Sequence, residues 1–281
     1  MNEKILSPKN NEVFLALFSK PEHNECVLTP FLRRILKLPN LDPNNVQILD
    51  PRLHIGREDE KHPIVDVLVK TPDGLIHIEM QYCDYEHMLE RIVYYHCRLF
   101  GDQLQQGHDY DELERTISLL ITDFPLIGEE INYFNRYLYM NPVTHNIFSY
   151  ISEIDTLELP KIPDIPDGSP EWIWGTYLNG EKEEDFMRLA ETYPEVQSAV
   201  NVLYELSADE ALRMRAEAVE KARRDEAARM KTSLKKGIEI GEQRRRREFA
   251  QMMRSDGESE EKIIRYTGYT YKDVDSWTCE Q

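Results

Sequence analysis

Acidic and amide side chains interrupt two apolar segments in the stretch KHPIVDVLVKTPDGLIHIEMQ, residues 61–81. Asp66 splits the first apolar run, and Glu79 and Gln81 close the second. A buried charge needs a partner, because removing it from water is costly. Two carboxylates that share a site also repel each other unless a proton or a cation lies between them. The stretch therefore contains the first candidate residues for chemistry.

The two runs predict a β-hairpin, because they are short, rich in β-branched residues and separated by turn residues. A four-residue loop at 71–74 would place Asp66 directly opposite Glu79, whereas a two-residue loop at 73–74 would place it opposite Gln81. In either register the three side chains share one face, since strand side chains alternate in direction. Cross-strand neighbours lie about 4.5–5.5 Å apart at Cβ, which is close enough for two carboxylates to hold one ion.

The chemistry that fits two such carboxylates is the binding of a hard, oxygen-liganded cation such as Mg²⁺ or Mn²⁺. The alternative is a structural one. Two acids on the strands of a hairpin are a common pattern, and most pairs of this kind are exposed charges on edge strands.

Helical and strand periodicities predict an α/β core around the hairpin. Amphipathic helices at 10–20 and 24–38 precede strands at 46–56, 62–70 and 75–81, and a helix at 84–107 and an apolar strand at 115–124 follow. We expect the helix at 84–107 to begin at Asp84 as its N-cap and to end at Gly107. The order helix, three strands, helix, strand predicts an α/β sandwich with a mixed central sheet.

The second half of the chain predicts a different organisation. Residues 134–151 indicate a hairpin around Asn141 and Pro142, and a strand, a proline-rich segment and two helices at 183–194 and 195–206 follow. Residues 207–254 have the composition of a long solvated helix, and two short helices joined at Gly268 come last. We therefore expect a core domain at 1–206, a long charged helix or linker at 207–254, and a small helical segment at 255–281.

The formal net charge of −18 disfavours a nucleic-acid surface spread over the whole chain. The charge is uneven, however, because residues 207–250 carry 13 Lys and Arg against 9 Asp and Glu, a net of +4. The acidic residues in 1–206 either keep the chain soluble or hold divalent cations. No apolar run approaches the roughly 20 residues of a membrane span, and the first residues lack the apolar core of a signal peptide. The expected compartment is the cytoplasm, with no membrane partner.

The order of these motifs resembles the PD-(D/E)XK nuclease fold, and more closely its recombination-promoting nuclease and transposase family. An Asp–hairpin–EMQ core followed by an ER..YY helix is typical of that family, and here DVLVKTPDGLIHIEMQ precedes ERIVYYHCRLFGDQLQQGHDY. The likeness extends to LSPKNNEVFLALF, LELPK and the Ala/Lys/Glu-rich helix. It implies a restriction-endonuclease-like core with an all-helical C-terminal extension.

The resemblance also implies an activity: a metal-dependent DNA endonuclease that hydrolyses phosphodiester bonds and is associated with recombination or mobile elements. Asp66 and Glu79 would bind Mg²⁺ (or Mn²⁺), and the carbonyl of Met80 could add an oxygen ligand. Gln81 stands where the broader fold has a lysine, so it can orient a water or a phosphate oxygen but brings no positive charge.

Several further residues have expected roles at the same site. Arg91 is the preferred phosphate contact, although an ion pair with an acid of the body would explain it equally well, and Lys61 is a second source of positive charge. The family's first helix usually carries an acid and a lysine where this chain has Asn11 and Leu15. The neighbouring Glu12 could substitute for that acid.

Three alternatives remain open from the sequence. His77 shares the Glu79 face and could be an auxiliary ligand, although a lone histidine on a strand is more often a packed residue. A catalytically degenerate protein that binds DNA without cleaving it would explain the missing first-helix acid. The helix at 207–254 could instead join copies of the chain into a homo-oligomer, and its QRRRRE run could contact the DNA backbone.

Overall fold

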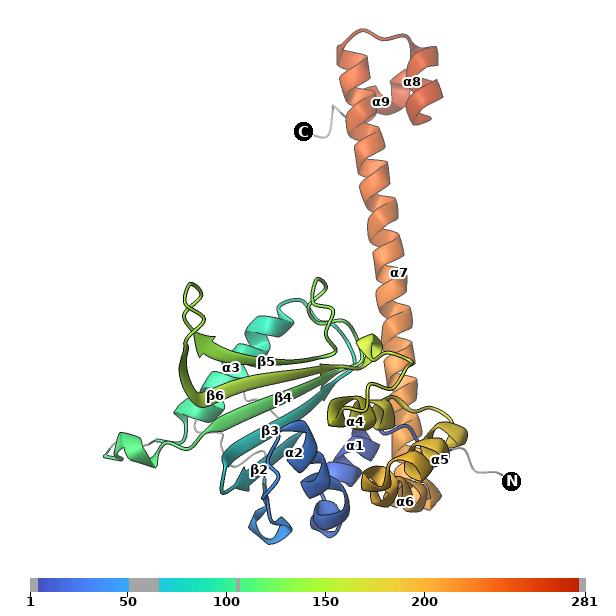
Figure 1. The fold of residues 1–281 in the computed structure, drawn as a ribbon. Helices are drawn as coiled ribbons and strands as arrows, with labels where there is room; N and C mark the ends of the chain where they lie inside the picture. Colours follow the sequence, from blue (N-terminus) through green and yellow to red (C-terminus); the bar gives the residue numbers. More distant parts are fainter. Residues whose placement is uncertain (1–4, 51–65, 105–106, 278–281) are drawn as a thin grey trace. The chain divides into compact units, whose positions relative to one another are not determined.

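The computed structural model describes residues 5–50, 66–104 and 107–277. The chain groups into two compact units, Met1–Val219 and Glu220–Gln281. The first unit contains a mixed six-stranded sheet, as predicted for the core, and the second is helical (Figure 1). No helix within the described ranges has the length and apolar character needed to cross a membrane.

The sheet combines parallel and antiparallel pairs in the order β1-β2-β3-β4-β6-β5. Its strands are β1 Gln47–Leu49, β2 Val67–Thr71, β3 Gly74–Gln81, β4 Thr116–Thr122, β5 Phe134–Met140 and β6 Ile147–Glu158. The β3–β4 and β4–β6 pairs are parallel, and the others are antiparallel. β4 is the strand expected to be covered on both faces, and each of its seven residues is buried.

The turn between β2 and β3 fixes the register of the first hairpin. Lys70 pairs with Leu75 and Thr71 pairs with Gly74, which is the register of the longer predicted loop. Gly74 has a φ of 124°, and a Cβ there would come within 2.1 Å of the carbonyl oxygen of Arg115. Only glycine fits this position, so the turn chemistry and the close approach of β4 together set the register.

One face of the sheet packs against a helical layer made by the N-terminal segment and the helices after β6 (Figure 1). The helices are α1 Asn11–Phe18, α2 Thr29–Ile35, α4 Pro170–Asn179, α5 Glu183–Thr192 and α6 Pro194–Ala208. Short 3-10 or π segments lie at Pro21–His23, Asn24–Leu28, Pro43–Asn45, Tyr110–Glu112 and Leu159–Lys161. The predicted second helix therefore divides into a π segment and α2.

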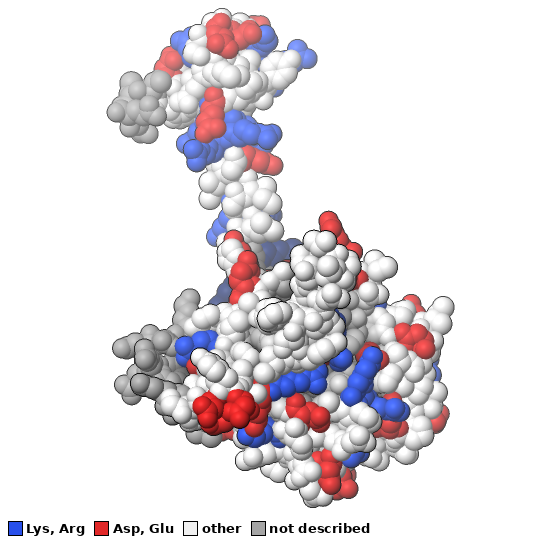
Figure 2. Space-filling model, turned by 60° about the vertical axis from the view of Figure 1, so that its left-hand side comes forward, with Lys and Arg blue, Asp and Glu red and all other residues white. Residues whose placement is uncertain are grey.

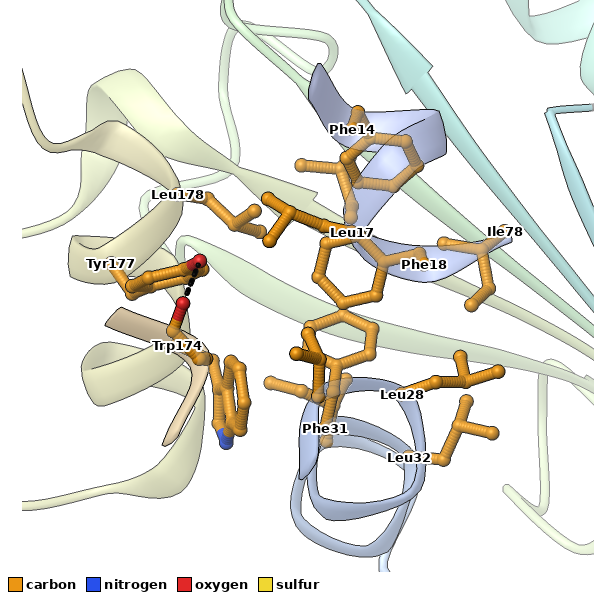
Figure 3. Close-up of a cluster of buried hydrophobic side chains, with 14 of the residues drawn as sticks. Phe14, Leu17, Phe18, Leu28, Phe31, Leu32, Ile78, Trp174, Tyr177 and Leu178 are labelled. Carbon is orange, nitrogen blue, oxygen red and sulfur yellow. Dashed lines mark hydrogen bonds between the residues drawn. The ribbon is translucent and has the colours of Figure 1, made fainter. Parts of the chain in front are cut away.

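Aromatic rings form the centre of this layer (Figure 3). The ring centroids of Phe18 and Phe31 are 5.0 Å apart, and those of Phe31 and Trp174 are 5.3 Å apart at an interplanar angle of 80°. The buried Tyr177 hydroxyl donates to the carbonyl oxygen of Ala199 at 3.0 Å. Trp174 and Tyr177 belong to α4, a helix that the sequence patterns did not predict, because its residues are apolar on more than one side.

The opposite face is covered by α3, Met88–Gly101. The helix begins four residues after the predicted N-cap, Asp84, and His87 with a φ of 64° precedes its first turn. It also ends before Gly107, at Gly101. A small cluster of Leu68, Leu75 and Leu99 packs it against β2 and β3.

A buried histidine joins α3 to the middle of the sheet. His96 Nδ1 lies 2.8 Å from Ser118 Oγ on β4, and its Nε2 lies 2.7 Å from Ser152 Oγ on β6. Burial lowers the pKa of His96 to about 4, and the charge of His77 adds to that shift. The neutral ring can donate through one nitrogen and accept through the other, since serine hydroxyls do both.

The second unit contains most of α7, Glu210–Ser255, together with α8 Glu260–Thr267 and α9 Tyr271–Trp277. Ala250, Met253, Ile263 and Val274 form its small core. Gly268, with a φ of 77°, ends α8 in the left-handed conformation that favours glycine. The two short helices joined at this glycine confirm the predicted helical extension.

The His96 contact predicts a specific loss of stability in acid. A histidine whose folded pKa lies below its unfolded pKa contributes full stability above the unfolded value, and the contribution is lost as the pH falls toward 4. Between pH 7.5 and pH 5 we expect the wild-type chain to lose about 2 kcal/mol more unfolding free energy than His96→Gln. Urea titrations followed by circular dichroism at both pH values measure the difference, and equal pH dependence in the two proteins would contradict it.

Candidate metal centre

The two acids lie where the β2–β3 ladder ends. The last pair of the ladder is Val67 with Ile78, so Asp66 precedes β2 at the position opposite Glu79. The backbone N–H of Met80 donates to Asp66 Oδ2 at 2.9 Å, which ties the end of one strand to the other. Asp66 is half-buried and Glu79 is only 6% exposed. The register thus brings together two acids that are distant in sequence.

Glu79 is held by donors on the face covered by α3. His77 Nε2 lies 3.1 Å from Glu79 Oε2, and the Gln81 amide donates to Glu79 Oε1. Arg91 on α3 places Nη2 3.6 Å from the same Oε1, with its guanidinium 5.2 Å from the ring centroid of Tyr95. The alternation of β3 puts His77, Glu79 and Gln81 on this one face.

Electrostatics at the pair disfavour a second negative charge. Burial raises the pKa of the Asp66 carboxyl to about 6. The hydrogen bond from Met80 opposes the shift, the Glu79 carboxylate adds to it, and His77 and Arg91 oppose it. A carboxyl with a raised pKa beside a second carboxylate is typical of a functional site. A bound cation would remove the repulsion between the two negative charges.

The donor set fits a hard divalent cation. Met80 directs its N–H toward Asp66, and the carbonyl of the same residue points to the same side of a strand. Two carboxylates and one main-chain oxygen are the ligand types that Mg²⁺ and Mn²⁺ favour. Among the described residues, no group of three or more His, Cys, Asp and Glu side chains is placed to hold a metal ion.

Most of the predicted site residues come together, and one does not. Asp66, Glu79, Met80, Gln81, His77 and Arg91 form a connected group. Glu12, the proposed substitute for the first-helix acid, instead accepts from Arg215 Nε at 2.9 Å. Leu15 packs against the core of the helical layer, and Lys61 lies outside the described residues.

Two residues that brace the site were missed from the sequence. The N–H of Asp123, just after β4, donates to the carbonyl oxygen of Gln81 at 2.9 Å. The Asp123 carboxylate in turn accepts from Lys9 Nζ at 2.8 Å. No spacing rule could have found this pair, because Lys9 and Asp123 are 114 residues apart.

The acid pair and its amide and guanidinium neighbours lie at one end of the mixed sheet. The chain belongs to the family described as PD-(D/E)XK nuclease family transposases, whose model matches residues 8–233. The matched span contains the sheet, the acid pair and the first half of α7. No protein with a curated description and no solved structure matches the chain significantly. Family membership supports a nuclease or transposase-like function, with DNA as the implied substrate.

The raised pKa of Asp66 predicts that the centre costs stability. A carboxyl with a raised folded pKa destabilises the fold once it ionises, so the cost is absent below about pH 4 and complete above about pH 6. Without divalent cations, Asp66→Asn should raise the unfolding free energy at pH 8 by about 2 kcal/mol and have little effect at pH 4. Urea titrations at both pH values test this, and a variant that is destabilised equally at both would contradict it.

Proposed function

We propose that the protein is a metal-dependent DNA endonuclease that hydrolyses phosphodiester bonds, with a role in recombination or in mobile elements. The observation that carries the proposal is the placement of Asp66 opposite Glu79, with Gln81 on the same face. Membership of the nuclease family supports the choice of DNA as substrate. The biological role rests on the family alone.

The two acids and the Met80 carbonyl are the proposed ligands of Mg²⁺ or Mn²⁺. When bound, the cation would supply charge stabilisation at the phosphate and lower the pKa of the attacking water. Asp66 and Glu79 supply the negative charge that holds it. His77 contacts the Glu79 carboxylate from two residues earlier on the same face of β3, so we propose His77 as an auxiliary orienting residue rather than a ligand.

Gln81 takes the position of the fold's lysine and performs part of its role. Its amide donates to Glu79 in the structure, and the same amide can orient a water or a phosphate oxygen when DNA is bound. It adds no positive charge against the charge that develops in hydrolysis. Stabilisation of that charge therefore falls to the cation and to nearby basic residues.

Arg91 is the proposed phosphate contact. Its side chain is 38% exposed, so the guanidinium reaches both the Glu79 carboxylate and solvent. A guanidinium has five N–H donors and can hold a carboxylate and a phosphate together. Lys61 is the second proposed contact, on the sequence evidence alone.

A second candidate is a catalytically degenerate protein on the same fold that binds DNA or oligomerises. Asn11 and Leu15 favour it, because neither can supply the acid or the lysine of the family's first helix. Exposed apolar side chains on α7, among them Leu234 and Ile238, favour assembly of copies through the helix at 207–254. Such a protein would bind DNA and leave it intact.

Plasmid nicking with Mg²⁺ or Mn²⁺ tests the endonuclease directly. We expect the wild-type chain to nick supercoiled DNA, and Glu79→Ala and Asp66→Ala to reduce the rate by more than about 100-fold, since each loses a ligand. Calorimetric titration of both ions should show the same loss of binding. Glu90→Ala is the matched control, because Glu90 is an exposed acid in the first turn of α3 and should leave both readouts unchanged. DNA binding without nicking in the wild-type chain would favour the degenerate candidate.

Gln81→Lys tests the role of the missing charge. A lysine there would remain close to Glu79 and add a positive charge beside the reacting phosphate, so we expect single-turnover nicking to accelerate by roughly tenfold at saturating Mg²⁺. Gln81→Met, which removes both the amide and any charge, should instead slow nicking. A Gln81→Lys rate at or below that of Gln81→Met would argue against this role.

A further inference from the structure

The β5–β6 hairpin extends beyond the rest of the sheet. β4 pairs with β6 only from Ser152 onward, so residues 147–151 of β6 have β5 as their sheet neighbour. This two-stranded ribbon carries six exposed apolar side chains, here named the tip surface: Tyr139, Met140, Val143, Ile147, Phe148 and Tyr150. Phe148 is 88% exposed and Val143 is 83% exposed. An isolated two-stranded ribbon is marginally stable in water, so a contact that covers it would stabilise it.

The tip surface exposes a large apolar area in total. Its six side chains expose on the order of 700 Å², given the area of aromatic side chains and their exposed fractions. A standard interface needs about 800 Å² from each partner, so a contact through this ribbon has to use both of its faces, because successive strand residues such as Ile147 and Phe148 point to opposite faces. Tyr, Phe and Met are also the residues enriched in interface cores.

Charge identifies the kind of partner. Residues 137–152 contain no Asp, Glu, Lys or Arg, although 31% of the chain is charged. Figure 2, which brings this side of the first unit forward, shows a broad area of uncharged side chains. DNA is disfavoured as the partner, because phosphate contacts need Lys and Arg and this segment has none. Copies of a chain with a net charge of −18 repel each other, and a surface free of charge is where that repulsion is weakest.

The edge of β5 is protected against direct strand pairing. Arg136 points inward, with Nε 2.9 Å from Glu153 Oε1 and 3.3 Å from Asp155 Oδ1. The ladder to β6 is also irregular between Leu138 and Met140. Inward charges and bulges are the devices by which edge strands avoid sheet extension. Contact through side chains of the tip surface therefore fits better than pairing of the β5 edges.

We propose that the tip surface binds the tip surface of a second copy of this chain in a two-fold symmetric pair. Each hairpin then covers the exposed aromatic side chains of the other, as an isologous interface requires. The proposal is independent of the nuclease proposal, since it is tested by molecular mass and not by cleavage.

Sedimentation equilibrium of the full chain, from about 1 to 100 µM, tests the pair. We expect the wild-type mass to approach twice the chain mass of 33.2 kDa. Phe148→Glu and Tyr150→Glu place charge in the interface and should weaken the dimer at least tenfold. Tyr110→Glu is the matched control, because Tyr110 is 89% exposed and lies outside the hairpin. Circular dichroism establishes that each variant is folded.

Two outcomes would overturn the proposal. The first is a wild-type chain that stays monomeric over the whole range. The second is a Phe148→Glu variant that dimerises as strongly as Tyr110→Glu. If the molecular mass falls in Leu234→Glu instead, the dimer forms through α7. If the wild-type chain is monomeric and its affinity for a DNA duplex or for anionic lipid vesicles falls in Phe148→Glu, the tip surface belongs to that partner instead.

Discussion

The hydrogen-bond register between β2 and β3 is the constraint on which the candidate centre depends. A shift of one residue would turn Asp66 to the other face of the sheet and separate it from Glu79. Gly74 prevents the shift, because the β2–β3 turn presses against the backbone of Arg115 at the start of β4. A glycine at one end of the hairpin thus determines the geometry of the acids at the other end.

The two faces of the sheet divide stability and chemistry between them. The face toward α1, α2 and α4 carries the large apolar core, in which aromatic rings contact one another. The face toward α3 carries polar groups at its centre, including His96, Ser118 and Ser152, and the candidate metal centre at its end. Charged groups can be kept buried or half-buried on the second face because packing on the first face supplies the stability.

The features that the sequence predicted are those that depend on short-range preferences of the chain. Periodicity and turn residues were sufficient for the mixed sheet, for both hairpins and for the helical extension, since these depend on short-range preferences. The alternating strand pattern also predicted that Asp66, Glu79 and Gln81 share a face. It left two loop lengths open, and the structure has the register of the longer loop. The predicted start of α3 at Asp84 was wrong. Aspartate is a favoured N-cap residue, but the chain makes a further turn at His87 before α3 begins. Helix α4 and the Lys9–Asp123 brace depend on tertiary contacts that no local pattern records.

The sheet topology also separates the proposed dimer interface at the tip surface from the candidate metal centre. β4 and β6 run parallel, so the end of β6 at Glu158 lies beside the end of β4 and near Gln81, whereas its beginning lies at the opposite end of the sheet. At about 3.3 Å per residue, the ten steps along the strand from Phe148 to Glu158 span about 33 Å. A contact at the tip surface would therefore lie far from the acid pair. The proposed assembly and the proposed substrate site therefore use different parts of the first unit.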